Sequence, residues 1–377
     1  MGTIDPVTAA HDVRAVVEAN ADEAERIRRL PAPTVGALTD AGLMRLCVPR
    51  DYGGPEVDPM TMVEAIEAVA VGDGAAGWCA MIASTTSTLA NFLPPVTARE
   101  VYGDPAVVTG GVAAPNGAGE AAEVDGRPGY RVSGRWAWGS GTQHCQWILG
   151  GAICDGAWRF CFVPGSVVEF HDTWFTGGMR GSGSLDYSVN DVFVPAERTL
   201  EVGAMRAQVD GSLGRFPTFT LLAAGVAAVG LGVARRALDE LVAIAQGKRP
   251  QFSSRTLAES AFTQVEVARA EARLRAARAF LLDELRSAWS VAEDGGRVSV
   301  DRRVTIRLAA AHAAGTAVDA ADTAYTLAGG TAVYDTSVLG RCLRDAHVVT
   351  QHIQTAPRVH EPLGRALLGL DVDTSMF

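Results

Sequence analysis

The chain has 377 residues, of which 48% are hydrophobic and 20% charged, and its net charge is -10. This balance excludes a mainly disordered chain, and the length predicts two or three packed modules. Because phosphate backbones select basic surfaces, we expect no nucleic-acid partner. The six cysteines include no C-x-x-C pair, which argues against a disulfide framework or a structural zinc site. We expect free thiols and no metal.

The start of the chain and its most apolar stretch bear on localisation. Residues 1–22 carry charges throughout and lack the apolar run of a signal peptide. Residues 221–233 are apolar, but two arginines follow almost at once and the run is too short to span a bilayer. We interpret it as a buried helix and expect a soluble, cytoplasmic protein without a membrane partner.

The first third of the chain is expected to be helical. Apolar residues at helical spacing, with Ala, Glu and Arg between them, predict helices over 10–30, 34–46, 60–71 and 75–92. Pro31 and Pro33 end the first of these helices. Together these segments predict an N-terminal all-helical domain over residues 1–105.

The composition changes near residue 106, where glycines become frequent. Residues 129–138, 147–154, 158–163 and 187–194 are rich in β-formers, and Asp-Gly turns separate several of them. We predict a central β-domain over residues 106–205, with a small barrel or a sandwich as its form.

The remainder, residues 206–377, returns to helical composition. Ala-, Leu- and Arg-rich segments cover 218–245, 254–292, 301–328 and 338–355. Four long helices joined by short loops are typical of a four-helix bundle. The fold class is therefore α+β, with a β-domain between two helical domains.

Several short segments carry a resemblance to a known family. Residues 41–54 read AGLMRLCVPRDYGG, residues 178–184 read GMRGSGS, and residues 189–195 read VNDVFVP. Residues 327–334 read LAGGTAVY, and residues 341–345 read RCLRD. In this order they resemble landmarks of the acyl-CoA dehydrogenase superfamily and cover most of the chain. The resemblance implies the same three-part fold and a flavin cofactor.

Two departures from the dehydrogenase pattern indicate a branch within that superfamily. Residues 112–119 read VAAPNGAG and lack the Glu and the Ser-Asp that dehydrogenases carry at this point. Nine residues after Arg344, where dehydrogenases commonly place a catalytic Glu, stands Ile353, and His352 precedes it. A histidine here resembles the two-component flavin-dependent monooxygenases.

This branch implies an activity and its partners. The expected enzyme receives reduced FMN or FAD from a separate flavin reductase. It then inserts oxygen from O2 into an aromatic or small ring substrate through a C4a-(hydro)peroxyflavin. The resemblance also implies a homotetramer.

The expected site residues follow from the matched motifs. His352 titrates near neutral pH in its ordinary state, which suits a catalytic role, and Ser140 matches the hydroxyl residue that contacts flavin N5 in the family. His347 is interpreted as structural. The expected cofactor contacts are Trp138, Ser140, Arg180, Gly181, Ser182, Arg255, Gly329 and Gly330. Candidates to line a substrate pocket are Trp78, Phe92, His144 and Trp174.

Two other functions stay open at this point. The first is an FAD-dependent dehydrogenase of acyl-CoA or acyl-carrier substrates, with its base moved to Glu240, Glu259 or Glu361. The second is a non-catalytic assembly partner that keeps the fold.

Overall fold

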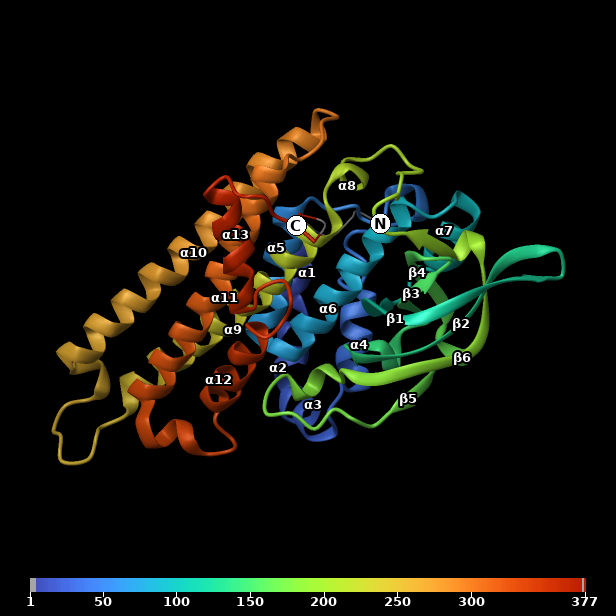
Figure 1. The fold of residues 1–377 in the computed structure, drawn as a ribbon. Coiled ribbons are helices and arrows are strands. Elements are labelled where there is room, and N and C mark those ends of the chain that lie inside the picture. The colour runs from blue at the N-terminus through green and yellow to red at the C-terminus, as the bar shows by residue number, and fades with distance from the viewer. Residues whose placement is uncertain (1–4, 375) are drawn as a thin grey trace.

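The N-terminal helices form the middle layer of the molecule. The computed structural model describes residues 5–374 and 376–377. The helices α5 (Pro59–Gly72) and α6 (Gly74–Ser87) pack against the long bundle helix α9 (Thr218–Gly247), and α6 also contacts strand β1 (Thr109–Val124). In Figure 1 these blue helices lie between the β-sheet and the C-terminal bundle. The two outer domains therefore meet on α6.

The other N-terminal helices are short. The region expected as one helix over 10–30 contains α1 (Pro6–Asp12), α2 (Arg14–Ala19) and α3 (Ala21–Ile27), and Arg28 ends α3 at φ 57°. Next follow α4 (Ala32–Asp40) and, after α6, α7 (Pro95–Tyr102). The predicted single helix was wrong because it spans two interruptions, at Val13 and Asn20.

The β-domain is one curled mixed sheet with the strand order β5-β6-β2-β1-β3-β4-β7. The bounds are β2 (Arg127–Gly139), β3 (Trp147–Cys154), β4 (Ala157–Pro164), β5 (Glu169–His171), β6 (Leu185–Pro195) and β7 (Thr199–Glu201). Its curl brings β4 and β6 into contact although they are not neighbours. The hydrogen-bonded order has two ends, and contacts of β4 with β6 and with β1 fold the sheet back on itself.

The first strand of the sheet was not predicted from the sequence. β1 reads TGGVAAPNGAGEAAEV, a composition with low strand propensity. It pairs with β2 on one side and, in parallel, with β3 on the other, so both of its edges are hydrogen-bonded. Pairing on both sides therefore overrides the local preference.

The C-terminal domain contains the expected four long helices. After the one-turn helix α8 (Ser212–Arg215), they are α9, α10 (Ala261–Glu293), α11 (Val300–Ala328) and α12 (Val338–Val349), and the short α13 (His360–Leu367) follows. Among the described residues, α9 alone is apolar and long enough to cross a membrane, but 78% of its most apolar window is buried as the centre of the bundle.

The last bundle helix is shorter than expected. α12 ends at Val349, so residues 350–356 form a turn, and His352 lies in that turn rather than on a helix. His347 lies on α12 and His352 lies beyond its end, so the two histidines do not share a helix. The turn places His352 against α6 instead.

Candidate active site

Ser140 lies just beyond the end of β2, where the chain turns sharply. Its hydroxyl is buried and accepts a hydrogen bond of 2.9 Å from the indole Nε1–H of Trp78 on α6. Trp138, two residues earlier, has φ 66° and leaves 73% of its surface exposed. The turn thus presents an open aromatic face beside a buried hydroxyl.

Three serine hydroxyls form a chain at this turn. The Oγ atoms of Ser140 and Ser184 lie 2.7 Å apart, and those of Ser184 and Ser182 also lie 2.7 Å apart. Trp78 contributes a fourth donor, because an indole N–H can only donate. The three hydroxyls and the indole supply four hydrogens, and the three hydrogen bonds between them use only three. When Ser140 accepts from both neighbours, the fourth hydrogen is free to reach a ligand.

Trp78 also contacts His352, so one indole touches both expected catalytic residues. The ring centroids of Trp78 and His352 lie 5.6 Å apart with an interplanar angle of 76°, an edge-on contact. The two residues come from α6 and from the turn after α12. The structure therefore brings Ser140, Trp78 and His352 together from three distant parts of the chain.

The protonation state of His352 follows from its surroundings. Burial, with a smaller contribution from the positive charge of Arg307, lowers the pKa of His352 to about 4. The ring is therefore neutral near pH 7. Its Nδ1 accepts the backbone N–H of Gln354 at 3.3 Å, which places the hydrogen of the neutral ring on Nε2. His352 thus offers an N–H donor and is a poor base at this pH.

Two buried side chains near His352 are not fully hydrogen-bonded within the described residues. The amide of Gln354 is fully buried, and neither its oxygen nor its nitrogen is hydrogen-bonded. Arg307 on α11 is also buried, and only its Nη2 has a hydrogen bond, 3.0 Å to the carbonyl of Met376. Burial lowers the pKa of Arg307 to about 10. Unpaired groups of this kind are costly unless a ligand or a bound water contacts them.

His144 lies on the same turn as Ser140, in the short 3-10 helix Thr142–His144. Burial lowers its pKa to about 4, so this ring is also neutral near pH 7. A side chain at Gly141 would lie 3.0 Å from Nε2 of His144 and 3.3 Å from Sγ of Cys79, which itself donates to the carbonyl of Ser182. His144 therefore packs against Gly141, the residue that follows Ser140.

The loop that precedes β6 is held by side chains behind it. The Nε1–H of Trp174 donates to the carbonyls of Met179 and Arg180, each at 3.1 Å. Arg180 turns its Nε–H to the carbonyl of Glu25 at 3.2 Å, and Gly181 packs against Ala24 and Ala75. Within this structure Trp174, Arg180 and Gly181 fasten the loop, and Ser182 is the member whose hydroxyl connects to Ser140.

Four other expected residues lie away from Ser140. Phe92 is buried in a separate core cluster with Leu89 and Tyr102. Arg255 lies in the loop between α9 and α10, and Gly329 and Gly330 follow α11. These two segments lie at the end of the bundle that Figure 1 places farthest from the sheet, and Lys248 joins them by hydrogen bonds to Ala328 and to Thr331.

No carboxylate takes the position of a dehydrogenase base in the described part of the chain. Ile353 is 49% exposed and apolar. Glu259 caps a 3-10 turn by bonding the N–H and hydroxyl of Thr256, Glu240 pairs with Arg236 at 3.8 Å, and Glu361 lies in the exposed first turn of α13. Each of these acids has a surface or structural position.

The residues at this turn fit the edge of a flavin. An isoalloxazine ring has a flat aromatic face and, at N5 and O4, polar atoms that hydrogen-bond. The exposed indole of Trp138 matches the face, and the buried hydroxyl of Ser140 matches the polar edge when it accepts from both neighbours and keeps its own hydrogen for the flavin.

Comparison with known proteins agrees with this fit. Residues 8–94 match the acyl-CoA dehydrogenase N-terminal domain, and residues 224–357 match its C-terminal domain. The chain therefore belongs to the acyl-CoA dehydrogenase family. This result confirms the fold and the family that the motifs predicted.

Individual relatives indicate to which branch of this family the chain belongs. The chain is 35% identical to an indole-3-acetate monooxygenase of Pseudomonas putida, over 92% of this chain and 89% of that protein. It is 31% identical to HsaA, the oxygenase subunit of a flavin-dependent monooxygenase of Rhodococcus jostii, over 94% and 96% of the two chains. The structure of XiaF from Streptomyces, in complex with FADH2 and glycerol, superimposes with a TM-score of 0.90 at 27% identity and covers 97% of this chain and 95% of XiaF. These matches confirm the prediction of a flavin-dependent monooxygenase.

Proposed function

We propose that this chain is the oxygenase component of a two-component system and inserts one atom of O2 into an aromatic or small ring substrate. It would receive reduced flavin from a separate reductase. The observation that carries the proposal is the Ser140–Trp78–His352 arrangement, with an apolar Ile353 where a dehydrogenase needs its base.

The flavin would lie against the turn after β2. Trp138 would cover part of the ring, and Ser140 would donate its spare hydrogen to the polar edge. Bound reduced flavin supplies the electrons that activate O2. The buried serine chain and Trp78 exclude water from that edge, as a reactive oxygen species requires.

His352 would act on the substrate side as a neutral hydrogen-bond donor. Its Nε2–H can hold an oxygen atom of the substrate or of O2 in place, and its low pKa keeps it uncharged through the neutral range. This role differs from that of a group that changes its charge near neutral pH, which was expected from the ordinary pKa of histidine.

The finer features of the proposal concern flavin, assembly and location. We favour reduced FAD over FMN because XiaF was crystallised with FADH2. A homotetramer would cover the apolar side chains exposed on the bundle and its loops, Phe252, Phe262, Val265 and Tyr334, and would bring Arg255, Gly329 and Gly330 to a neighbouring subunit's cofactor. A cytoplasmic location suits the supply of reduced flavin by a diffusing reductase.

Oxygen incorporation tests the proposal directly. The protein would be mixed anaerobically with chemically reduced FAD, then with ¹⁸O2 and a panel of phenols and indoles that includes indole-3-acetate. We expect one ¹⁸O atom in a product detected by mass spectrometry. Reoxidation of the flavin at its free rate, with no labelled product and with bleaching of bound FAD by an acyl-CoA, would establish the dehydrogenase alternative. Parallel runs with reduced FMN, and light scattering of the purified protein, test the cofactor and the tetramer.

A further inference from the structure

A buried carboxylate on α12 holds the loop that carries two of the site serines. Oδ1 of Asp345 accepts the backbone N–H of Met179 at 2.5 Å, and Met179 has φ 50°, an uncommon conformation for a residue with a side chain. The backbone of Gly178 lies so close to that of Arg344 and Asp345 that a side chain there would collide with it. The loop is thus seated directly on α12 at this acid.

Backbone hydrogen bonds continue from Met179 to the flavin-side turn. The carbonyl of Met179 accepts the N–H of Ser182 at 3.0 Å, and the carbonyl of Ser182 accepts the N–H of Gly141 at 2.9 Å. The hydroxyl of Ser182 begins the serine chain that ends at Ser140. Two backbone hydrogen bonds therefore connect Met179, which the Asp345 carboxylate holds, to the turn that carries Ser140.

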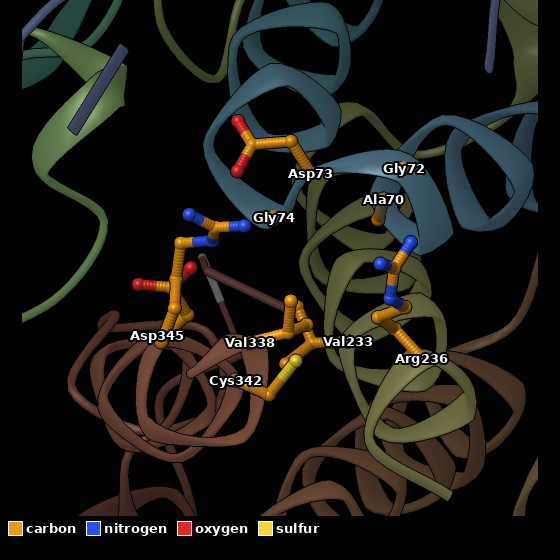
Figure 2. A pocket seen from close by; sticks show the side chains of 10 residues that line it. Ala70, Gly72, Asp73, Gly74, Val233, Arg236, Val338, Cys342 and Asp345 are labelled. Atoms are coloured by element: carbon orange, nitrogen blue, oxygen red, sulfur yellow. The ribbon is translucent and has the colours of Figure 1, made fainter. Parts of the chain in front are cut away.

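The same carboxylate is next to the other two parts of the site. Asp73 begins α6, the helix of Trp78, and its Oδ2 accepts the N–H of Ala76 at 3.0 Å. Asp73 and Asp345 line one small cavity, shown in Figure 2, in which Gly74 leaves room for Oδ2 of Asp345. Beyond Asp345, α12 runs only to Val349 before the turn that carries His352.

The cavity itself is too small for a ligand. Its volume is about 10 Å³, which is at most the space for one water. The charged groups around it are Asp73, Arg341 on α12, Glu25 and Asp22 on α3, and Arg236 on α9. Burial and the nearby Asp73 raise the pKa of Asp345 to about 7, and burial raises that of Asp73 to about 6. The charged groups around this cavity therefore connect α3, α6, α9 and α12 and leave no room for a bound ligand.

We propose that Asp345 is a positioning residue, which sets the distance between the flavin-side Ser140 and the substrate-side His352 by fixing the 179–184 loop and α12 to the start of α6. This inference rests on the proposed function, because it assumes that Ser140 faces the flavin. What Asp345 supplies is an acceptor oxygen at one place rather than a charge.

Two substitutions of similar volume separate the acceptor from the charge. Asp345→Asn keeps an oxygen for Met179, whereas Asp345→Leu removes it. We expect Leu to raise hydrogen exchange in the peptide covering 177–184 at least tenfold and to weaken reduced-FAD binding about tenfold. We expect Asn to stay within about twofold of the natural protein in both measurements. Asp58→Ala, which removes the cap of α5, is the control for general destabilisation, and it should leave the exchange of 177–184 unchanged.

The outcomes are distinct. Unchanged exchange of 177–184 in Asp345→Leu, or loss of FAD binding in Asp345→Asn equal to that in Asp345→Leu, would overturn the inference. If Asp345→Leu does not fold, Trp174→Phe loosens the same loop from its other side and should raise exchange there and weaken FAD binding; failure to do so also overturns it. A natural protein that binds no reduced flavin would refute the proposed function instead, while the exchange measurement would still test the anchor.

Discussion

The two sides of the candidate site differ in how completely their polar groups are paired. On the proposed flavin side, Ser140 has hydrogen-bond partners in both Trp78 and Ser184, and backbone hydrogen bonds hold the surrounding turn. On the proposed substrate side, the buried amide of Gln354 has no hydrogen-bond partner among the described residues, and the buried guanidinium of Arg307 has one. The flavin side is therefore organised before a ligand binds. The substrate side keeps unpaired groups that a ligand could satisfy.

The largest effect is expected at His352, on the substrate side. Asparagine can imitate the Nδ1 position of histidine and glutamine the Nε2 position. If Nε2–H is the working donor, His352→Asn should lower the yield of oxygenated product about 10²-fold, as loss of one aimed donor does, while His352→Gln should stay within about tenfold. Product per flavin consumed is measured at pH 7.5. A better rescue by Asn than by Gln would refute the assigned tautomer.

A smaller effect is expected on the flavin side. Ser140→Ala leaves the buried indole N–H of Trp78 without an acceptor, which should cost about 1–3 kcal/mol of unfolding free energy and weaken reduced-flavin binding about tenfold. Trp78→Phe keeps a ring against His352 and removes the donor. In the double variant the loss of unfolding free energy and of flavin affinity should be smaller than the sum of the two single losses, because the unpaired N–H is gone. Denaturant unfolding and flavin titration measure both quantities, and strict additivity would mean that the hydrogen bond contributes nothing.

The pH dependence of stability should show the smallest effect. The pKa values of His144 and His352, about 4, lie below the unfolded value near 6.5, so stability from these residues is lost as pH falls from 6.5 toward 4. Asp73 and Asp345 act in the opposite direction, because their raised pKa values make stability fall as pH rises from 3.8 toward 7.

Asp345→Asn removes one of these opposing contributions. Its unfolding free energy should therefore rise more steeply between pH 4.5 and 6.5 than that of the natural protein, by up to about 1.4 kcal/mol for each pH unit. Urea unfolding at the two pH values measures the slope. Equal slopes in the two proteins would show that Asp345 titrates normally.

Much of the fold could be predicted because long periodic segments dominate it. The helices α5, α9 and α11 and the strand β3 lie at or within two residues of their expected bounds. β1 escaped prediction because its glycines and alanines become a strand only through neighbours on both sides. The early end of α12 was missed because the residues after Val349 continue a helical composition.

The sequence motifs predicted some of the candidate site residues, but not those that are distinguished only by packing between distant segments. Ser140 and His352 were predicted from their match to motifs of the resembling family, and the structure brings both into contact with Trp78. Gln354 and Arg307 carry no local signal, since only burial without a partner distinguishes them. Ser184 and Asp345 stand in motifs that indicated the family, but their contacts join segments far apart in the sequence.

The early end of α12 also bears on how substrate range can change over time. Since residues 350–356 form a turn outside the bundle helices, substitutions there need not shift the register of the helices that build the core. Variation in this turn would alter what reaches His352 and leave the flavin side as it is. A library confined to these seven positions, less His352, is the economical way to redirect such an enzyme to new ring systems.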